Sequence, residues 1–305
     1  MTLNLVIKRI LIFSITVVLF QSFFSCQNKQ TTTEDKIEAQ VDQQIDSNAT
    51  QVIMFNGALF SIPSPYQISL LIKKEKIDFN EEMINPLQNT SNYTSNFKKA
   101  INLGVLGSDL AYLNIYEQTP TAIKYFSRIK ALSQELDISS CFDKKIIERV
   151  DKNMGNQDSL LVIISNSYRK ADKFLKENNR NDLGVLILTG GFIESLYSIT
   201  QLSANIKDQE LLYRIGEQKN PLENLIKIIS PYYNQSDDYS KLSDMLIDLA
   251  YDFDGIDINY TYEKPTVDVK NKLTVINSKS KVVVSDAQLT TIREKVSKIR
   301  DFIIE

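Results

Sequence analysis

Two acidic residues inside long apolar stretches of the chain are its best candidates for chemistry. Asp109 lies in the stretch Asn102–Tyr116 and Glu194 lies in Leu183–Leu202, where almost all neighbours are apolar or small. An ionised carboxylate in such surroundings is costly unless a partner satisfies it. Two carboxyl groups with raised pKa values that faced a pocket could perform acid/base hydrolysis. A pocket with the same two acids at its polar end could instead bind a small ligand.

The two acids also have a purely structural interpretation, in which other side chains satisfy them. The candidate partners are Tyr112, Tyr116, Tyr197, Arg128, Arg149, Arg169 and Arg214. Removing one member of such a set leaves the others unpaired, at a cost of ~1–3 kcal/mol or more. We expect this structural role, with no catalytic residue. The alternative is a ligand site formed by Asp109, Glu194, Tyr112 and Tyr197. Whether the two acids face each other is left open.

Composition excludes several classes of chemistry. The 305 residues include no histidine, so Ser-His and Cys-His nucleophile pairs and histidine-ligated zinc are impossible. An acidic run around Gly255 resembles a calcium loop, but Ala250 and Thr261 occupy its two outer ligand positions. No glycine-rich phosphate motif is present, and a net charge of −3 does not suit a nucleic-acid binder. We therefore predict no metal, no cofactor, no nucleic-acid partner and no enzymatic activity.

Two buried helices are needed to position the acids. Leu183–Leu202 is apolar around the whole helical wheel, as in a helix buried on every side, and its tetrapeptide Leu-Gly-Val-Leu also occurs 80 residues earlier. Small residues align along one side of each helix, so the two backbones can approach closely. These residues are Gly104, Gly107, Ser108 and Ala111 in the first helix and Gly184, Gly191, Ser195 and Ser198 in the second. We expect the two small faces to touch.

Further helices and a small β-hairpin surround this central pair. Caps, prolines and apolar periodicity predict helices at about 65–76, 95–117, 119–136, 143–153, 158–178, 182–204, 207–217, 221–229, 239–254 and 286–304. The runs Leu273–Ile276 and Lys281–Val284 flank a polar turn and predict a β-hairpin at about 272–284. The expected fold is all-α: one domain over residues 52–305, a multi-helix bundle of antiparallel hairpins around two Gly-faced central helices.

The N-terminus has the parts of an export signal. Two basic residues precede an apolar run, and the 15 residues from Ile10 to Phe24 are fewer than the ~20 that span a bilayer. Ser25 and Cys26 then resemble the cleavage box of bacterial lipoproteins, in which the cysteine is acylated by fatty acids such as palmitate. We predict a lipoprotein signal peptide at 1–25, lipidation of Cys26 and a flexible polar tether at 26–51. A soluble secreted protein or an uncleaved anchor are the alternatives.

Three motifs resemble an uncharacterised helical lipoprotein family of Bacteroidetes-type bacteria. They are Ile62–Pro65, Leu103–Tyr112 and Gly190–Tyr197. The resemblance implies the lipid anchor and the envelope compartment, and it carries no activity with it. The motif residues coincide with the close-packing positions of the two central helices, which suits a structural role.

The expected function is therefore that of a lipid-anchored helical scaffold or interaction module of the bacterial cell envelope. Gln27 after the cysteine favours the outer membrane, facing the periplasm. Its expected partners are the membrane, through the N-terminal lipid, and an unidentified envelope protein or small ligand. A periplasmic binder of a small ligand or lipid near Asp109 and Glu194 is the alternative, and a carboxylate-dependent enzyme is the third possibility.

Overall fold

A computed structural model describes residues 51–55, 58–62, 76–139, 144–153 and 180–305, apart from 205, 207, 269, 271 and 272, with single residues between 156 and 177. The predicted signal peptide, Cys26, the tether up to residue 50, the helix predicted at 65–76 and nearly all of the one predicted at 158–178 lie outside the described residues. The prediction that Cys26 is lipidated is therefore not addressed by the fold.

The described chain is mostly helical, which confirms the predicted fold class. Its helices are α4 (Asn96–Ile115), α5 (Thr119–Glu135), α6 (Lys144–Asn153), α8 (Asn181–Leu202), α9 (Gln209–Gly216), α10 (Lys219–Ile229), α11 (Asp237–Asp254) and α12 (Asp286–Ile304). Shorter 3-10 segments are η2 (Glu81–Met83), η3 (Leu87–Asn92) and η5 (Ser230–Gln235). The expected bounds of these helices were within two residues of the observed ones.

Polar caps explain why the helix bounds could be predicted. The Ser95 hydroxyl accepts the Lys98 backbone N–H at 3.1 Å and so begins α4. At the start of α12, Ser285 and Gln288 form a reciprocal capping box, with distances of 3.2 and 3.0 Å. The Gln288 side chain also donates to the Gly255 carbonyl at 2.7 Å, which ties the start of α12 to the end of α11.

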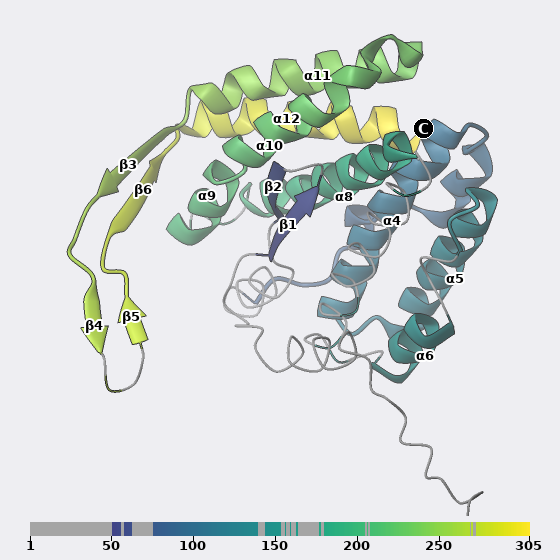
Figure 1. Cartoon of the computed structure of the whole chain (residues 1–305), viewed down its shortest axis with the longest axis horizontal. Helices are drawn as coiled ribbons and strands as arrows, with labels where there is room; N and C mark the ends of the chain where they lie inside the picture. Colours follow the sequence, from purple (N-terminus) through teal and green to yellow (C-terminus); the bar gives the residue numbers. More distant parts are fainter. Residues whose placement is uncertain are drawn as a thin grey trace, which may run out of the picture. The chain divides into compact units, whose positions relative to one another are not determined.

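The helices pack in layers around α8 (Figure 1). On one side α8 contacts α4, which forms an antiparallel hairpin with α5. On the other side α12 crosses α8 and also reaches α4, while α11 covers α12. α10 packs against both α8 and α11. Helix α8 is consequently surrounded, as its uniformly apolar wheel predicts.

The central helices α4 and α8 approach backbone to backbone through glycine. A Cβ atom added at Gly104 would lie 1.9 Å from the Ile187 carbonyl oxygen, and one at Gly190 would lie 1.8 Å from that of Ile101. Farther along, the Ser108 and Ser195 hydroxyls hydrogen-bond to each other at 3.0 Å. Of the predicted small residues, Gly104 and Ser108 thus meet Gly191 and Ser195, but Gly190, absent from the predicted set, is one of the two tightest points.

The residues that meet between α4 and α8 are separated in the sequence by a different number of positions from the two copies of the tetrapeptide. The bonded serines are 87 residues apart, whereas the two copies of Leu-Gly-Val-Leu are 80 apart. Gly104 lies beside Gly191, and Ser108 beside Ser195, so the two helices run in the same direction. The tetrapeptide repeat therefore does not mark equivalent positions of the interface.

Helix α8 is also the one segment of the described chain that is long and apolar enough to cross a membrane. Its mean hydropathy over the most apolar window is 1.5, but 83% of that window is buried inside the protein. The core helix of a soluble protein has the same properties, so this helix is weak evidence for a membrane span.

Three pairs of antiparallel strands accompany the helices. Near the N-terminus, β1 (Gln51–Phe55) pairs with β2 (Ala58–Ile62). Near the C-terminus, β3 (Asp257–Thr261) pairs with β6 (Lys279–Val283), and β4 (Thr266–Asp268) pairs with β5 (Leu273–Val275). The last two pairs follow each other in one two-stranded ribbon, hereafter the ribbon, residues 257–283 (Figure 1).

A small β-hairpin near the C-terminus is thus confirmed, but its predicted strand partners are wrong. The sequence predicts a turn at Asn277–Ser280, but Lys279 and Ser280 belong to β6, which leaves Asn277 and Ser278 outside the strands. They instead bond across the ribbon: the Asn277 amide donates to the Lys264 carbonyl at 2.8 Å, and the Ser278 hydroxyl accepts the Glu263 N–H at 3.1 Å. The alternating stretch from Ile258 supplies a partner strand upstream, which moves the connection to the residues between Asp268 and Leu273.

Candidate functional site

The two acids singled out in the sequence meet at the centre of the helical domain. Asp109 from α4 and Glu194 from α8 are each only 1% exposed, and Arg300 from α12 is 5% exposed. The side chains of the two acids hydrogen-bond to each other. Three helices that are far apart in the sequence therefore contribute one charged group each to a buried cluster, hereafter the central cluster.

Glu194 and Arg300 form the ionic half of the central cluster. The Arg300 Nε donates to Glu194 Oε2 at 2.8 Å, and its Nη2 donates to Oε1 at 2.9 Å. This paired geometry is the strong arrangement for a guanidinium and a carboxylate. Burial is the largest single influence and lowers the pKa of Arg300, but the charge of Glu194, the hydrogen bonds to Glu194 and the charges of Asp109 and Tyr197 together hold that pKa above its ordinary value. The Tyr197 ring lies against the guanidinium, 4.3 Å from ring centroid to Arg300 Cζ.

Asp109 is an acid of the central cluster with a raised pKa. Burial is the main cause that raises its pKa well above the ordinary 3.8, followed by the charge of Glu194 and the hydrogen bond to Glu194. The charge of Arg300 and the Asn85 backbone N–H, which donates to Oδ2 at 3.2 Å, lower the pKa without offsetting burial. When Asp109 is protonated and donates to Glu194, one negative and one positive charge remain, and the cluster is then electrically balanced.

Asn85 joins this cluster to the segment that precedes α4. Its side-chain amide donates to the Tyr93 hydroxyl at 2.7 Å and to Asn102 Oδ1 at 3.3 Å, and its carbonyl accepts the Tyr125 hydroxyl at 2.6 Å. Burial raises the pKa of Tyr93 to about 12, so this phenol stays neutral and accepts the bond. A fully buried asparagine is tolerated here because its polar atoms have partners.

The structure brings together three of the four predicted ligand-site residues. Asp109 and Glu194 face each other, which the sequence could not show, and Tyr197 contacts their arginine. Tyr112 is positioned differently, because its hydroxyl bonds to the backbone of Asn80, at 3.2 Å to the N–H and 3.3 Å to the carbonyl. It stacks with Phe79 and Tyr116 instead of joining the cluster.

The arginine that satisfies the acids was missed in the sequence. Among the arginines proposed as partners, Arg128 pairs with Glu135 at 2.9 Å and Arg214 pairs with Glu217 at 3.1 Å, while Arg169 lies outside the described residues. A signal for Arg300 did exist. It falls on the apolar stripe of the last helix, with Val296 one turn before it and Ile303 three residues after it. A lone arginine on such a stripe needs a buried partner.

The central cluster is closed to solvent where the structure describes its walls. Among the pockets lined by described residues, one of about 780 Å³ and one of about 200 Å³ do not include Asp109, Glu194 or Arg300 in their lining, and each of the three residues is at most 5% exposed. Acid/base hydrolysis needs a carboxyl group within reach of a substrate or a water. The geometry of these three side chains is that of a charge-balanced core contact.

Stability should depend on pH through Asp109. Because the folded-state pKa is raised, the protonated group stabilises the fold fully below about pH 3.8, and this contribution is lost as the pH rises through the folded value. Asp109→Asn cannot ionise, so its free energy of unfolding should not fall between pH 3.8 and the folded-state pKa of Asp109. Relative to the wild type, the variant should therefore become more stable by up to about 1.4 kcal/mol per pH unit over this interval. Urea unfolding of both proteins at several pH values measures this difference, and two parallel stability curves would contradict it.

Comparison of the chain with known protein families, with curated protein sequences and with solved structures gives no match. The resemblance to a lipoprotein family, drawn from the three motifs, stays a prediction.

Proposed function

We propose that this chain is a lipid-anchored helical scaffold of the bacterial cell envelope and that it acts by holding a partner protein. In this proposal Cys26 carries the acyl chains, and the residues up to 51 form a tether that holds the helical domain away from the membrane, on the periplasmic face of the outer membrane. The domain has no catalytic role.

The observation that carries the proposal is the filled centre between the two main helices. An enzyme or a pocket binder built on Asp109 and Glu194 needs space beside them. Here the backbones touch at Gly104 and Gly190, and the two acids are satisfied by each other and by Arg300. A balanced cluster of this kind specifies how helices dock and leaves no free group for a substrate.

The ribbon offers a surface on which such a scaffold could hold its partner. Several of its large apolar side chains are highly exposed to solvent: Tyr260 is 63% exposed, Tyr262 is 69% exposed and Ile276 is 76% exposed. A two-stranded ribbon is only marginally stable alone, and its outer edges present unpaired backbone groups. One anchor to the helices is Val282, which is buried against Gly216 of α9. Large apolar side chains exposed in such number on one short segment are typical of protein-interaction surfaces.

Site-specific photo-crosslinking tests this function. A photo-reactive phenylalanine analogue at Tyr262 is expected to give one discrete protein adduct in intact cells. The matched control is Tyr251 on α11, a tyrosine that is 71% exposed and lies outside the ribbon, and the same analogue there should give no such adduct. Equal or only diffuse adducts from both positions would contradict the interaction role.

Acylation of Cys26 is tested by mass spectrometry of the N-terminal peptide from native membranes. The wild type is expected to carry the two or three acyl chains of a bacterial lipoprotein, which hold a protein firmly at ~0.8 kcal/mol per buried CH₂. Cys26→Ala should lose the acyl mass. The only other cysteine is Cys141, so Cys141→Ala should keep it and serves as control. An unmodified wild-type peptide would refute the anchor.

A further inference from the structure

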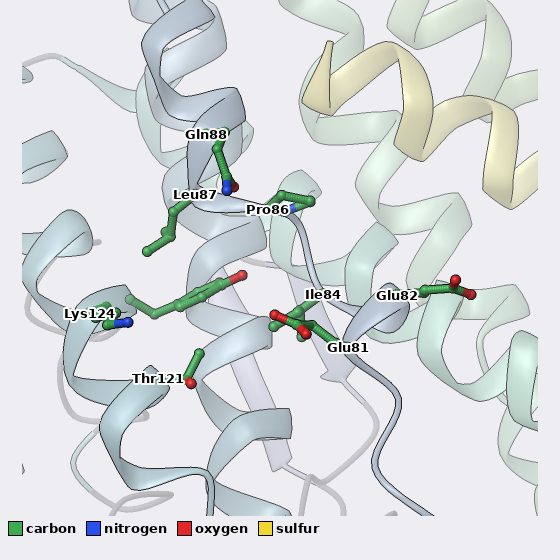
Figure 2. Close-up of a pocket in the computed structure, with 9 residues that line it drawn as sticks. Glu81, Glu82, Ile84, Pro86, Leu87, Gln88, Thr121 and Lys124 are labelled. Carbon is green, nitrogen blue, oxygen red and sulfur yellow. The ribbon is translucent and has the colours of Figure 1, made fainter.

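A groove of about 780 Å³ lies between the Glu81–Gln88 segment and the first turns of α5. Its volume falls in the range of ~300–1,000 Å³ that is usual for small-molecule sites. Figure 2 shows that side chains from both walls project into it, with Thr121 and Lys124 on the helix side and Glu81 on the opposite side. The groove is separate from the central cluster and from the ribbon.

The floor of the groove is apolar and firmly held. Ile84 and Tyr125 are each 3% exposed and line it together with the half-buried Leu87. The Tyr125 hydroxyl donates to the Asn85 carbonyl at 2.6 Å, and the Asn85 N–H donates to Asp109. The floor is thereby connected by hydrogen bonds, through Asn85, to the central cluster. A floor that does not need to be ordered on binding lowers the entropic cost of taking up a ligand.

The rim of the groove carries opposite charges that form no ion pair with any residue that the structure describes. Glu81 and Lys124 are exposed and project from opposite walls (Figure 2). Neither of them, nor Glu82, forms an ion pair within the described part of the chain. Gln88 and Thr121 add an amide and a hydroxyl to the lining of the groove. The groove thus presents a carboxylate that can bind a cation, an ammonium group that can bind an anion, and uncharged hydrogen-bonding groups above an apolar floor.

We propose that this groove binds a short peptide with free termini and an apolar side chain. Its ammonium group lies at Glu81, its carboxylate lies at Lys124, and its amide groups bond to Gln88 and Thr121. The apolar side chain rests on Ile84, Leu87 and Tyr125 and loses its contact with water there. The proposal goes beyond the scaffold role and does not depend on the lipid anchor or on the ribbon.

Isothermal titration of the full-length, acylated protein in detergent with trileucine tests the site. Trileucine with free termini is expected to bind, and the form that is both N-acetylated and C-amidated should bind at least tenfold more weakly. Lys124→Gln should weaken binding about fivefold for peptides with a free carboxylate and leave C-amidated peptides unaffected. Glu81→Gln should do the same for peptides with a free amine and leave N-acetylated peptides unaffected.

Two exposed residues outside the groove serve as matched controls. Lys130→Gln on α5 and Glu294→Gln on α12 remove the same charges and should leave every affinity unchanged. All four substituted side chains are exposed, so thermal melting should show equally folded proteins. The proposal is overturned if trileucine gives no binding heat at millimolar concentration, or if the capped and free peptides bind equally. It also fails if only one of the two groove variants changes affinity, because the ligand would then not be a zwitterion.

Discussion

Glu194→Gln is expected to lower the free energy of unfolding by about 3–5 kcal/mol, because it leaves the Arg300 guanidinium buried without a counter-charge. Arg300 is 5% exposed, and its three short contacts all end on the Glu194 carboxylate. Against a total stability of ~5–15 kcal/mol for a typical domain, a loss of this size is a large fraction. Urea unfolding followed by circular dichroism measures it.

Two further variants decide whether charge is the cause. Asp109→Asn is the matched control, since an amide can accept from Asn85 and donate to Glu194 as the protonated acid does, so it should cost less than about 1 kcal/mol near pH 4 and, because it cannot ionise, should be no less stable than the wild type at neutral pH. Combining Glu194→Gln with Arg300→Met should recover most of the loss, because it removes the orphaned charge while keeping the volume filled. Equal losses for the two isosteric changes, or a double variant no better than Glu194→Gln, would contradict the balanced cluster.

Gly104→Ala and Gly190→Ala should each destabilise the fold by at least ~3 kcal/mol, although each adds one methyl group. The added Cβ would lie within 2 Å of a backbone carbonyl oxygen of the facing helix, at 1.9 Å for Gly104 and 1.8 Å for Gly190. Backbone cannot rotate away as a side chain can, so α4 and α8 must separate and lose packing along their length. Thermal and urea unfolding should show the loss.

Gly255→Ala is the matched control for the two helix glycines. Its Cβ would meet the far end of the Gln288 side chain at 2.8 Å, and its φ of −75° suits any residue. We therefore expect a change below about 1 kcal/mol, since Gln288 can shift. If Gly104→Ala melted at the same temperature as Gly255→Ala, the close approach of α4 and α8 would be refuted.

The helical part of the fold could be predicted because its signals are local. Ser95 and Ser285 cap their helices, Pro120 opens α5, and the uniformly apolar stretch Leu183–Leu202 becomes the surrounded helix α8. Strand pairing failed because it depends on partners far along the chain. The run from Leu273 has two possible partners at similar distance, and nothing within it distinguishes Lys281–Val284 from Thr266–Asp268.

The central cluster could be predicted only in part, for a similar reason. Asp109 and Glu194 were recognisable because an acid in an apolar stretch must have a partner. Their mutual contact depends on which residues of α4 and α8 meet, at a sequence separation of 87 for the bonded serines. The close glycine contacts determine this alignment, and the spacing of the tetrapeptide repeat suggests a different one. Arg300 was visible on its apolar stripe, but the choice among all arginines needs the position of α12. The groove beside α5 combines residues with no shared sequence pattern.

Arg300 follows Glu194 by 106 residues along the chain, so α4 and α8 are both synthesised before the counter-charge of Glu194 exists. Until α12 has been made, α4 and α8 can meet only by burying an acid without its cationic partner, and that cost opposes their docking. Closure of the centre is thereby coupled to the synthesis of α12. A chain that stops before Arg300 lacks both the helix that covers α8 and the charge that balances Glu194. The buried ion pair thus makes docking of α4 and α8 depend on the presence of α12.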